Sequence, residues 1–361
     1  MPDATAPALY WPLNSWRLAG PAPIIRTMAK PSSSVSIETR PATAITINFG
    51  DPGQADTAAG LPHDGAGPCP TEQIIRDAIG VHPMALLFPA LVTDADERGA
   101  LDRLAETHGG DGVAYFVDTL AGGMAAYARP FALKSVVVRL SDFQSDEYTA
   151  LLGGRYFEPV EENPLVAFRG AVRYVHADYA PAFALECAAM VKARDEFGFT
   201  NLQPMVPYCR RAGEAQRVLD AMAANGLRRG DNGLKIHLMA EVPNNAAEID
   251  TLAQMFDGIS IGIRDFTQSV LGIDAAAAFV RDEDVDPCDP GVQHFMRMII
   301  DGAKRHNCPV SICGPAASGR LDLLEFVLRC GIDAISLRLE SVVRMTQEIL
   351  RIESRIAEEG R

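Results

Sequence analysis

The chain has 361 residues, of which 48% are hydrophobic and 22% are charged, and its formal net charge is −14. This composition is that of an ordinary globular protein, long enough for one large domain of about 250 residues plus an extension. The acidic balance excludes a general nucleic-acid binder, which needs a basic surface, but a local group of arginines could still hold a small anionic substrate.

Residues 1–43 are rich in Pro, Ala and Ser. We predict that they form an irregular N-terminal extension, with a transit peptide as the less favoured alternative. The seven cysteines of the chain form no Cys-x-x-Cys pair and no plausible disulfide framework, which favours a reduced, cytoplasmic compartment. No apolar run approaches the roughly 18 residues that a membrane span needs, so we expect no membrane partner.

After the extension, short apolar or β-branched runs alternate with helix-like segments, as in a parallel barrel. The runs predicted as strands are 44–49, 136–140, 165–168, 202–206, 234–239, 258–261, 309–312 and 334–337. Helical patterns lie between them at 211–225 and at 321–330, where Gly331 follows as a C-cap. The expected fold class is therefore α/β, a (β/α)8 TIM barrel over residues 44–361.

A long segment, about 50–134, separates the first two predicted strands. It contains helical patterns around 72–78 and 100–108. We interpret it as an insert after the first strand that forms an ordered subdomain or the surface of a homodimer.

Chemically capable side chains follow several predicted strands. Glu241, Asp265 and Cys313 each stand just after an apolar run. Side chains at the C-terminal ends of barrel strands converge on one mouth, so two carboxylates and a thiol should face one pocket. Carboxylate oxygens are the ligands that Mg2+ or Mn2+ prefers, although an isolated acid more often caps a helix or pairs with a lysine.

Two arginines, Arg139 and Arg169, stand at the ends of predicted strands. A guanidinium there can hold a phosphate or carboxylate through two hydrogen bonds, and the alternative role is a structural salt bridge. Arg173 is a weaker candidate for substrate binding; it could instead orient Asp142 or a neighbouring carboxylate.

Longer segments resemble a known family. They are Ile-Gly-Val-His-Pro at 79–83, Val-Arg-Leu-Ser-Asp-Phe at 138–143, Glu-Glu-Asn-Pro at 161–164, Phe-Arg-Gly-Ala-Val-Arg-Tyr at 168–174 and Gly-Leu-Lys-Ile at 233–236, together with the strand ends above. Over about residues 45–345, the chain resembles the C-terminal phosphoenolpyruvate (PEP)-binding barrel of phosphoenolpyruvate synthase (pyruvate, water dikinase). It is more distantly similar to pyruvate phosphate dikinase and to enzyme I of the sugar phosphotransferase system.

The resemblance implies that Glu241 and Asp265 bind Mg2+ or Mn2+ and that Arg139 and Arg169 hold the anionic substrate. It also implies that Cys313 exchanges a proton with carbon 3 of the enolate. An unperturbed thiol has a pKa near 8.5, and we expect a nearby metal and arginines to lower it. The alternative is an inert buried cysteine.

The chain also departs from the family. Arg264 replaces an asparagine that helps to hold the phosphate, and we predict that Arg264 binds substrate too. Segments 66–69, 275–276 and 315–318 differ from the family sequences as well.

Complete synthases add an ATP-binding domain and a swivelling domain whose histidine carries the phosphoryl group, and this chain shows neither pattern. We therefore predict a stand-alone barrel that binds PEP or pyruvate. It would catalyse metal-dependent enolisation and phosphotransfer, a partial reaction, with a separate ATP-binding phosphohistidine protein as partner. The alternatives are a metal-dependent ketoacid lyase or aldolase and a non-catalytic PEP-binding homologue.

Overall fold

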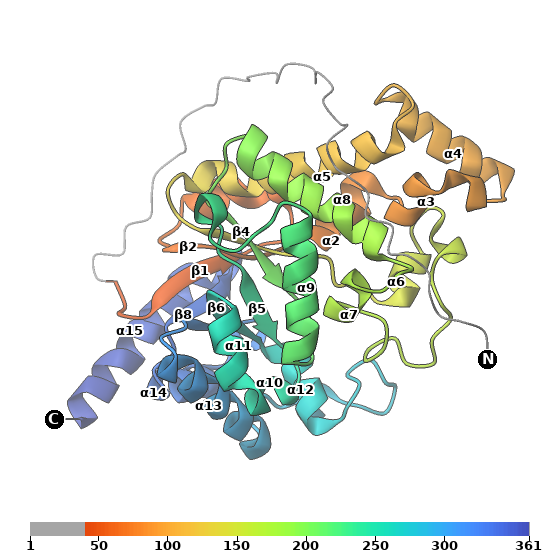
Figure 1. Ribbon diagram of the computed structural model, residues 1–361. Helices are drawn as coiled ribbons and strands as arrows, with labels where there is room; N and C mark the ends of the chain where they lie inside the picture. Colours follow the sequence, from red (N-terminus) through yellow and green to blue (C-terminus); the bar gives the residue numbers. More distant parts are fainter. Residues whose placement is uncertain (1–39, 361) are drawn as a thin grey trace. The chain divides into compact units, whose positions relative to one another are not determined.

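Eight parallel strands form a closed barrel in the computed structural model, which describes residues 40–360 (Figure 1). Each strand pairs with the next in chain order, and β8 closes the barrel against β1. The strands are β1 Ala44–Asn48, β2 Gly65–Pro70, β3 Val136–Arg139, β4 Leu202–Val206, β5 His237–Ala240, β6 Gly258–Gly262, β7 Val310–Cys313 and β8 Ala334–Arg338. The predicted (β/α)8 barrel is thus confirmed. The predicted extension 1–43 lies almost entirely outside the described residues.

Helices surround the strands, and α4 packs against α5 on the outside of this layer (Figure 1). The helices are α1 Ala55–Ala59, α2 Thr71–Ile74, α3 Pro83–Leu87, α4 Ala95–Glu106, α5 Gly112–Ala128, α6 Ser145–Thr149, α7 Ala171–Tyr174, α8 Ala180–Val191, α9 Ala212–Ala224, α10 Asn244–Ala247, α11 Ile249–Met255, α12 Ile263–Leu271, α13 Pro290–Arg305, α14 Leu321–Arg329 and α15 Val342–Glu359. Between Arg40 and Gly360, no helix is both long and apolar enough to cross a bilayer.

The helical predictions agree with the structure. The patterns at 211–225 and 321–330 are α9 and α14, and Gly331 has the positive φ of 75° expected after a helix end. The pattern at 100–108 belongs to α4, and that at 72–78 covers α2 and the helical turn Ile75–Ile79.

One predicted strand, 165–168, is wrong, because this segment is a loop. Its backbone carbonyls accept hydrogen bonds from arginine side chains instead of from a neighbouring strand. Arg169 donates to the carbonyl of Leu165 at 3.3 Å, and Arg210 donates to those of Val166 at 3.2 Å and Ala167 at 2.6 Å. Arg169 was predicted to stand at a strand end, but it lies in this loop.

The missing strand is β2, which lies inside the segment 50–134 that was interpreted as an insert between the first two strands. Its sequence, Gly-Ala-Gly-Pro-Cys-Pro, contains no β-branched residue. Gly65 is required by close packing, since a Cβ there would lie 2.7 Å from the carbonyl oxygen of Ser135. The correct second strand is thus built from small residues that let β3 approach.

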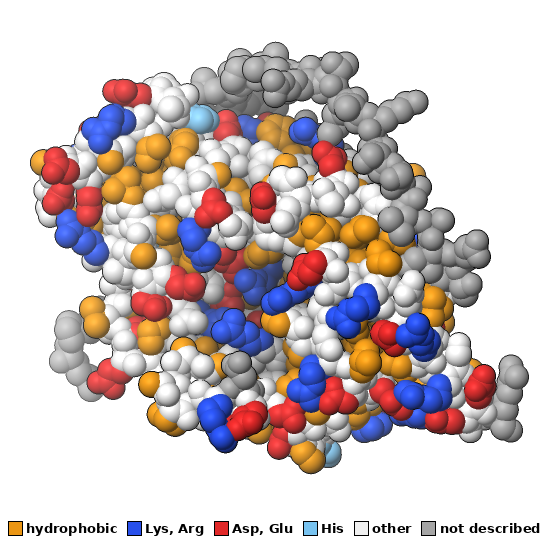
Figure 2. Space-filling view, turned by 180° about the vertical axis from the view of Figure 1, so that it is seen from behind, with side chains coloured by type: hydrophobic (Ala, Val, Ile, Leu, Met, Phe, Trp, Pro, Cys, Tyr) orange, Lys and Arg blue, Asp and Glu red, His pale blue; other side chains and the backbone are white. Residues whose placement is uncertain are grey.

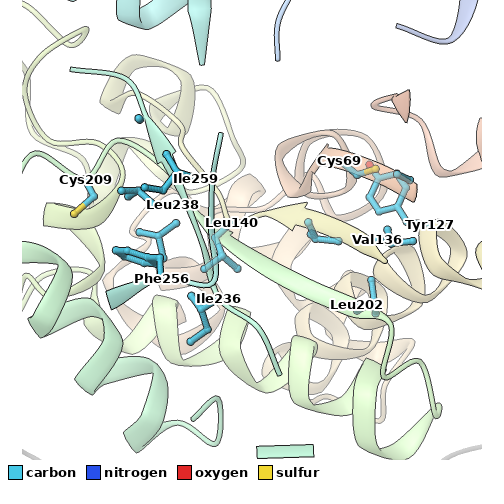
Figure 3. Close-up of a cluster of buried hydrophobic side chains, with 14 of the residues drawn as sticks. Cys69, Tyr127, Val136, Leu140, Leu202, Cys209, Ile236, Leu238, Phe256 and Ile259 are labelled. Carbon is cyan, nitrogen blue, oxygen red and sulfur yellow. The ribbon is translucent and has the colours of Figure 1, made fainter. Parts of the chain in front are cut away.

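Apolar side chains between strands and helices make the core rigid. Ile236, Leu238 and Ile259 gather with Phe256 in one part of this core, and all are buried (Figure 3). Close packing of this kind fixes the strands relative to one another. The residues at the strand ends therefore have defined positions.

Candidate active site

A cavity of about 920 Å³ lies at the C-terminal ends of the strands. Residues from β1, β2, β3, β5, β6, β7 and β8 line it, together with the loops that follow them. Figure 2 shows a face of the molecule on which acidic and basic side chains gather around a hollow. The barrel thus presents its charged strand-end residues to one space, as the fold predicts.

Three carboxylates meet in this cavity. Asp142 follows β3, Glu241 follows β5, and Asp265 lies in the first turn of α12, directly after β6. One oxygen from each lies within 4.8 Å of the other two. An all-oxygen donor set of this size fits a hard divalent cation such as Mg2+ or Mn2+.

The electrostatics of Glu241 support the same fit. Glu241 is only 2% exposed. Burial raises the pKa of Glu241 to about 8, and the negative charges of Asp142 and Asp265 add to the effect. A divalent ion would supply the positive charge that this buried carboxylate lacks.

The position of Glu241 is fixed by its backbone surroundings. The backbone N–H of Tyr208 donates to Glu241 Oε2 at 2.8 Å, and the Glu241 N–H donates to Asn245 Oδ1 at 3.0 Å. A Cβ at Gly262 would lie 2.8 Å from the Glu241 Cγ, so glycine is needed beside this carboxylate.

Arg169 joins two of the three acids. Its guanidinium donates to both oxygens of Asp142, at 3.1 and 2.5 Å, and to Asp265 Oδ2 at 2.7 Å. It also lies over the ring of Tyr208, 4.1 Å from the ring centroid. Burial lowers the pKa of Arg169, but the carboxylates of Asp142 and Asp265 more than offset this, so its net pKa is raised and it stays charged.

Arg139, the last residue of β3, reaches the same cavity. It donates to Glu72 Oε1 at 2.7 Å, and its side chain remains 28% exposed. Burial lowers the pKa of Arg139 as well, while Glu72 and Asp142 raise it more strongly. A charged guanidinium with exposed surface is suited to an anionic ligand.

Cys313 is the last residue of β7, and its thiol packs beside Met205 and Met239. Burial raises the pKa of the Cys313 thiol to about 11, which opposes the lowering expected from a nearby metal and arginines. The group is therefore a protonated thiol at neutral pH, the form that a proton donor requires.

The predicted contact between Arg173 and substrate is also wrong. Arg173 is fully buried and does not line the cavity. Its guanidinium donates to Glu158 Oε2 at 2.8 Å and to the Phe168 carbonyl at 2.7 and 3.0 Å. This is the alternative role of orienting a carboxylate, although that carboxylate is Glu158 and not Asp142.

The sequence that forms this cavity is similar to the sequences of known proteins. The family profile described as PEP-utilising enzyme, PEP-binding domain, matches residues 28–354. The chain belongs to the PEP-utilising enzymes.

Within this family, the chain is 42% identical over 314 residues to the phosphoenolpyruvate synthase of Synechocystis sp., covering 87% of this chain and 38% of that relative. It is 43% identical over 300 residues to the phosphoenolpyruvate synthase of Deinococcus radiodurans, covering 83% of this chain and 38% of that protein. The chain thus spans about two fifths of the length of these curated relatives.

Solved structures similar to this chain include CitE from Mycobacterium tuberculosis in complex with magnesium and pyruvate. That similarity has a TM-score of 0.43 and 11% sequence identity, and covers 85% of this chain and 90% of CitE. A HpcH/HpaI aldolase/citrate lyase family protein from Burkholderia cenocepacia is similar with a TM-score of 0.43 and 13% sequence identity. That similarity covers 87% of this chain and 95% of the Burkholderia protein.

Sequence reasoning missed the two acids of this cavity that pair with Arg169 and Arg139. Asp142 was named only as a possible partner of Arg173, and Glu72 was not considered. Both follow a strand, β3 or β2, by a few residues. For Asp142, the strand-end rule gives the signal; for Glu72, the signal was hidden because β2 itself was missed.

Proposed function

We propose that this chain is a barrel that binds pyruvate and PEP, interconverts pyruvate with its enolate, and exchanges a phosphoryl group at the enolate oxygen. The observation that supports this most is the convergence of a three-carboxylate cluster, two charged arginines and a protonated thiol in one cavity.

The acidic and the basic residues of the cavity would have different roles in this reaction. Glu241 and Asp265 would hold Mg2+ or Mn2+, which when bound supplies Lewis-acid polarisation of the keto oxygen. Arg139, whose guanidinium is partly exposed, would bind the carboxylate or phosphoryl group. Asp142 would hold Arg169 by its two hydrogen bonds and so position it beside the same anion.

Cys313 would move the proton. When the phosphoryl group leaves PEP, the enolate that remains takes the thiol proton onto carbon 3, and pyruvate forms. In the reverse direction, the cysteine thiolate removes a methyl proton from bound pyruvate. The raised pKa of Cys313 keeps the thiol protonated at neutral pH, so the group carries the proton that the donor direction needs.

The phosphoryl carrier would come from outside the barrel. Among the described residues, no histidine lines the cavity. We therefore include in the proposal a phosphohistidine presented at the mouth by an ATP-binding partner protein.

The same observation favours a second candidate, a metal-dependent ketoacid lyase, since cleavage through an enolate needs no phosphohistidine. The two candidates differ in products. A lyase releases pyruvate from a 4-hydroxy-2-ketoacid without any phosphoryl acceptor, whereas the phosphotransferase consumes PEP only when a histidine-bearing acceptor is present.

Exchange of the methyl protons of pyruvate in heavy water, followed by NMR, tests the enolisation step that both candidates share. We expect exchange that depends on Mg2+ or Mn2+ and is lost in Glu241→Gln and Cys313→Ser. Cys308→Ser is the matched control, because Cys308 is also buried but does not line the cavity. Full exchange in Cys313→Ser would show that the thiol is not the proton donor.

A further inference from the structure

Two arginines in the cavity differ from Arg139 and Arg169, which are held by carboxylates. Arg264 lies in the first turn of α12 after β6, and Arg338 is the last residue of β8. Both side chains are exposed and line the cavity. Within the part of the chain that the structure describes, neither side chain makes a hydrogen bond or an ion pair.

These arginines lie on the two sides of Cys313. The strands are ordered β6, β7, β8 in the barrel, and Gly262 at the end of β6 is in register with Cys313 at the end of β7. The backbone N–H of Arg338 donates to Ser318 Oγ at 2.9 Å, which ties the end of β8 to the loop after β7. Arg338 therefore has a fixed backbone position beside the thiol strand.

The charge around the mouth is uneven. The exposed acids Asp146, Glu147 and Glu162 follow β3, which is opposite β7 in a barrel of eight strands. On the α12 side, the cavity is also lined by Asp274, whose carboxylate accepts the Ala276 N–H at 2.8 Å. Arg76 and Arg139 line the β3 side too, but each is paired with a glutamate. A second anionic group of the substrate is thus attracted to the unpaired guanidinium groups on the two sides of β7.

Resting on the proposed function, we propose that Arg264 and Arg338 form a second anion subsite, and that the preferred substrate is a 2-ketodicarboxylate. In that function, Cys313 faces carbon 3 of the enolate. A chain that continues beyond carbon 3 must pass the thiol, and β6 and β8 place one unpaired guanidinium on each side of it. Loops after strands 7 and 8 of such barrels commonly hold an anion. The cavity of about 920 Å³ is also much larger than a three-carbon acid needs.

Calorimetry with Mg2+ and two nearly isosteric ligands tests this subsite. The ligands are 2-oxoglutarate and 2-oxopentanoate, which differ by a carboxylate in place of a methyl group. We expect the wild type to bind 2-oxoglutarate at least tenfold more tightly, and the ratio to fall toward one in Arg264→Asn and in Arg338→Asn. Arg344→Asn is the matched control, because Arg344 is an exposed arginine that does not line the cavity. It should keep the wild-type ratio.

Two results would overturn the inference. One is equal binding of both ligands by the wild type. The other is a larger effect of the two substitutions on PEP than on 2-oxoglutarate, which would assign the arginines to a phosphoryl group. Proton exchange of pyruvate in the wild type distinguishes failure of the subsite from failure of the proposed function. If exchange occurs but the dicarboxylate is not preferred, only the subsite is refuted. If exchange does not occur, the enolisation itself is refuted.

Discussion

Replacing Glu241 by Gln should stabilise the metal-free protein while removing its response to metal. Glutamine has nearly the same volume as glutamate and keeps an oxygen to accept the Tyr208 N–H. It carries no charge, so the electrostatic cost of a buried carboxylate beside Asp142 and Asp265 disappears.

The magnitude follows from the pKa of Glu241, which burial raises from 4.5 to about 8. A carboxyl group with a raised pKa binds its proton more tightly in the folded state. Its cost to stability is therefore absent below about pH 4.5, grows as pH rises, and is complete above about pH 8. At about 1.4 kcal/mol per pH unit, the interval from 4.5 to 8 corresponds to at most about 5 kcal/mol. Since neighbouring acids share this cost, we expect about 2–4 kcal/mol of stabilisation by Glu241→Gln at pH 8.

Chemical denaturation at pH 5 and pH 8, in chelator and in excess Mg2+, measures each part of this prediction. In chelator at pH 8, the variant should be more stable than the wild type, and the difference between the two proteins should be smaller at pH 5. In Mg2+, only the wild type should gain stability, because binding to the folded state alone stabilises it. Glu340→Gln, which changes an exposed acid outside the cavity, should shift stability by no more than about 0.5 kcal/mol. The reasoning is refuted if Glu241→Gln is no more stable than wild type in chelator at pH 8, or if Mg2+ stabilises both proteins equally.

Three further results are expected. Tyr208→Leu removes the ring beneath Arg169 but keeps the backbone N–H, so calorimetry should show ligand affinity reduced by about 0.5–2 kcal/mol with Mg2+ affinity unchanged; equal losses would contradict this. Arg173→Leu leaves the buried Glu158 side chain with His82 as its remaining partner and should cost about 3–5 kcal/mol of unfolding free energy in denaturant titrations, and a loss below about 1 kcal/mol would be inconsistent with the ion pair. In metal-free protein, alkylation of Cys313 followed by mass spectrometry should be slow at pH 7 and rise steeply only toward pH 11, whereas rapid labelling at pH 7 would disprove the raised pKa.

The fold was predictable wherever local sequence and tertiary contacts agreed. The segments at 202–206 and 334–337 have strand composition and are strands. The segment 165–168 has strand composition too, but its carbonyls are bound by Arg169 and Arg210, and the second of these lies more than 40 residues away in the chain. Conversely, β2 has no strand composition and exists because β1 and β3 pair with it. Both errors arise from long-range contacts that composition does not reveal.

The residues of the site were predictable where they stand at strand ends. The strand-end rule brought Arg139, Glu241 and Cys313 into one cavity without knowledge of the structure. It ranked Arg173, four residues after Arg169, as the weaker candidate, but it could not identify the partners of either arginine. Their different roles depend on which carboxylate lies within reach, and these partners come from other loops.

The position of Arg169 has a consequence for the order in which ligands arrive. Its guanidinium balances Asp142 and Asp265 inside the oxygen cluster that suits a divalent ion, so it serves as a substitute cation in the metal-free protein. If Asp265 held a divalent ion, its bond with Arg169 would weaken, and a guanidinium N–H would become available to an anion. Metal and anion should therefore bind with positive cooperativity, each raising the affinity for the other by the same factor. Ordered entry, ion before ketoacid, is the kinetic scheme that this arrangement favours.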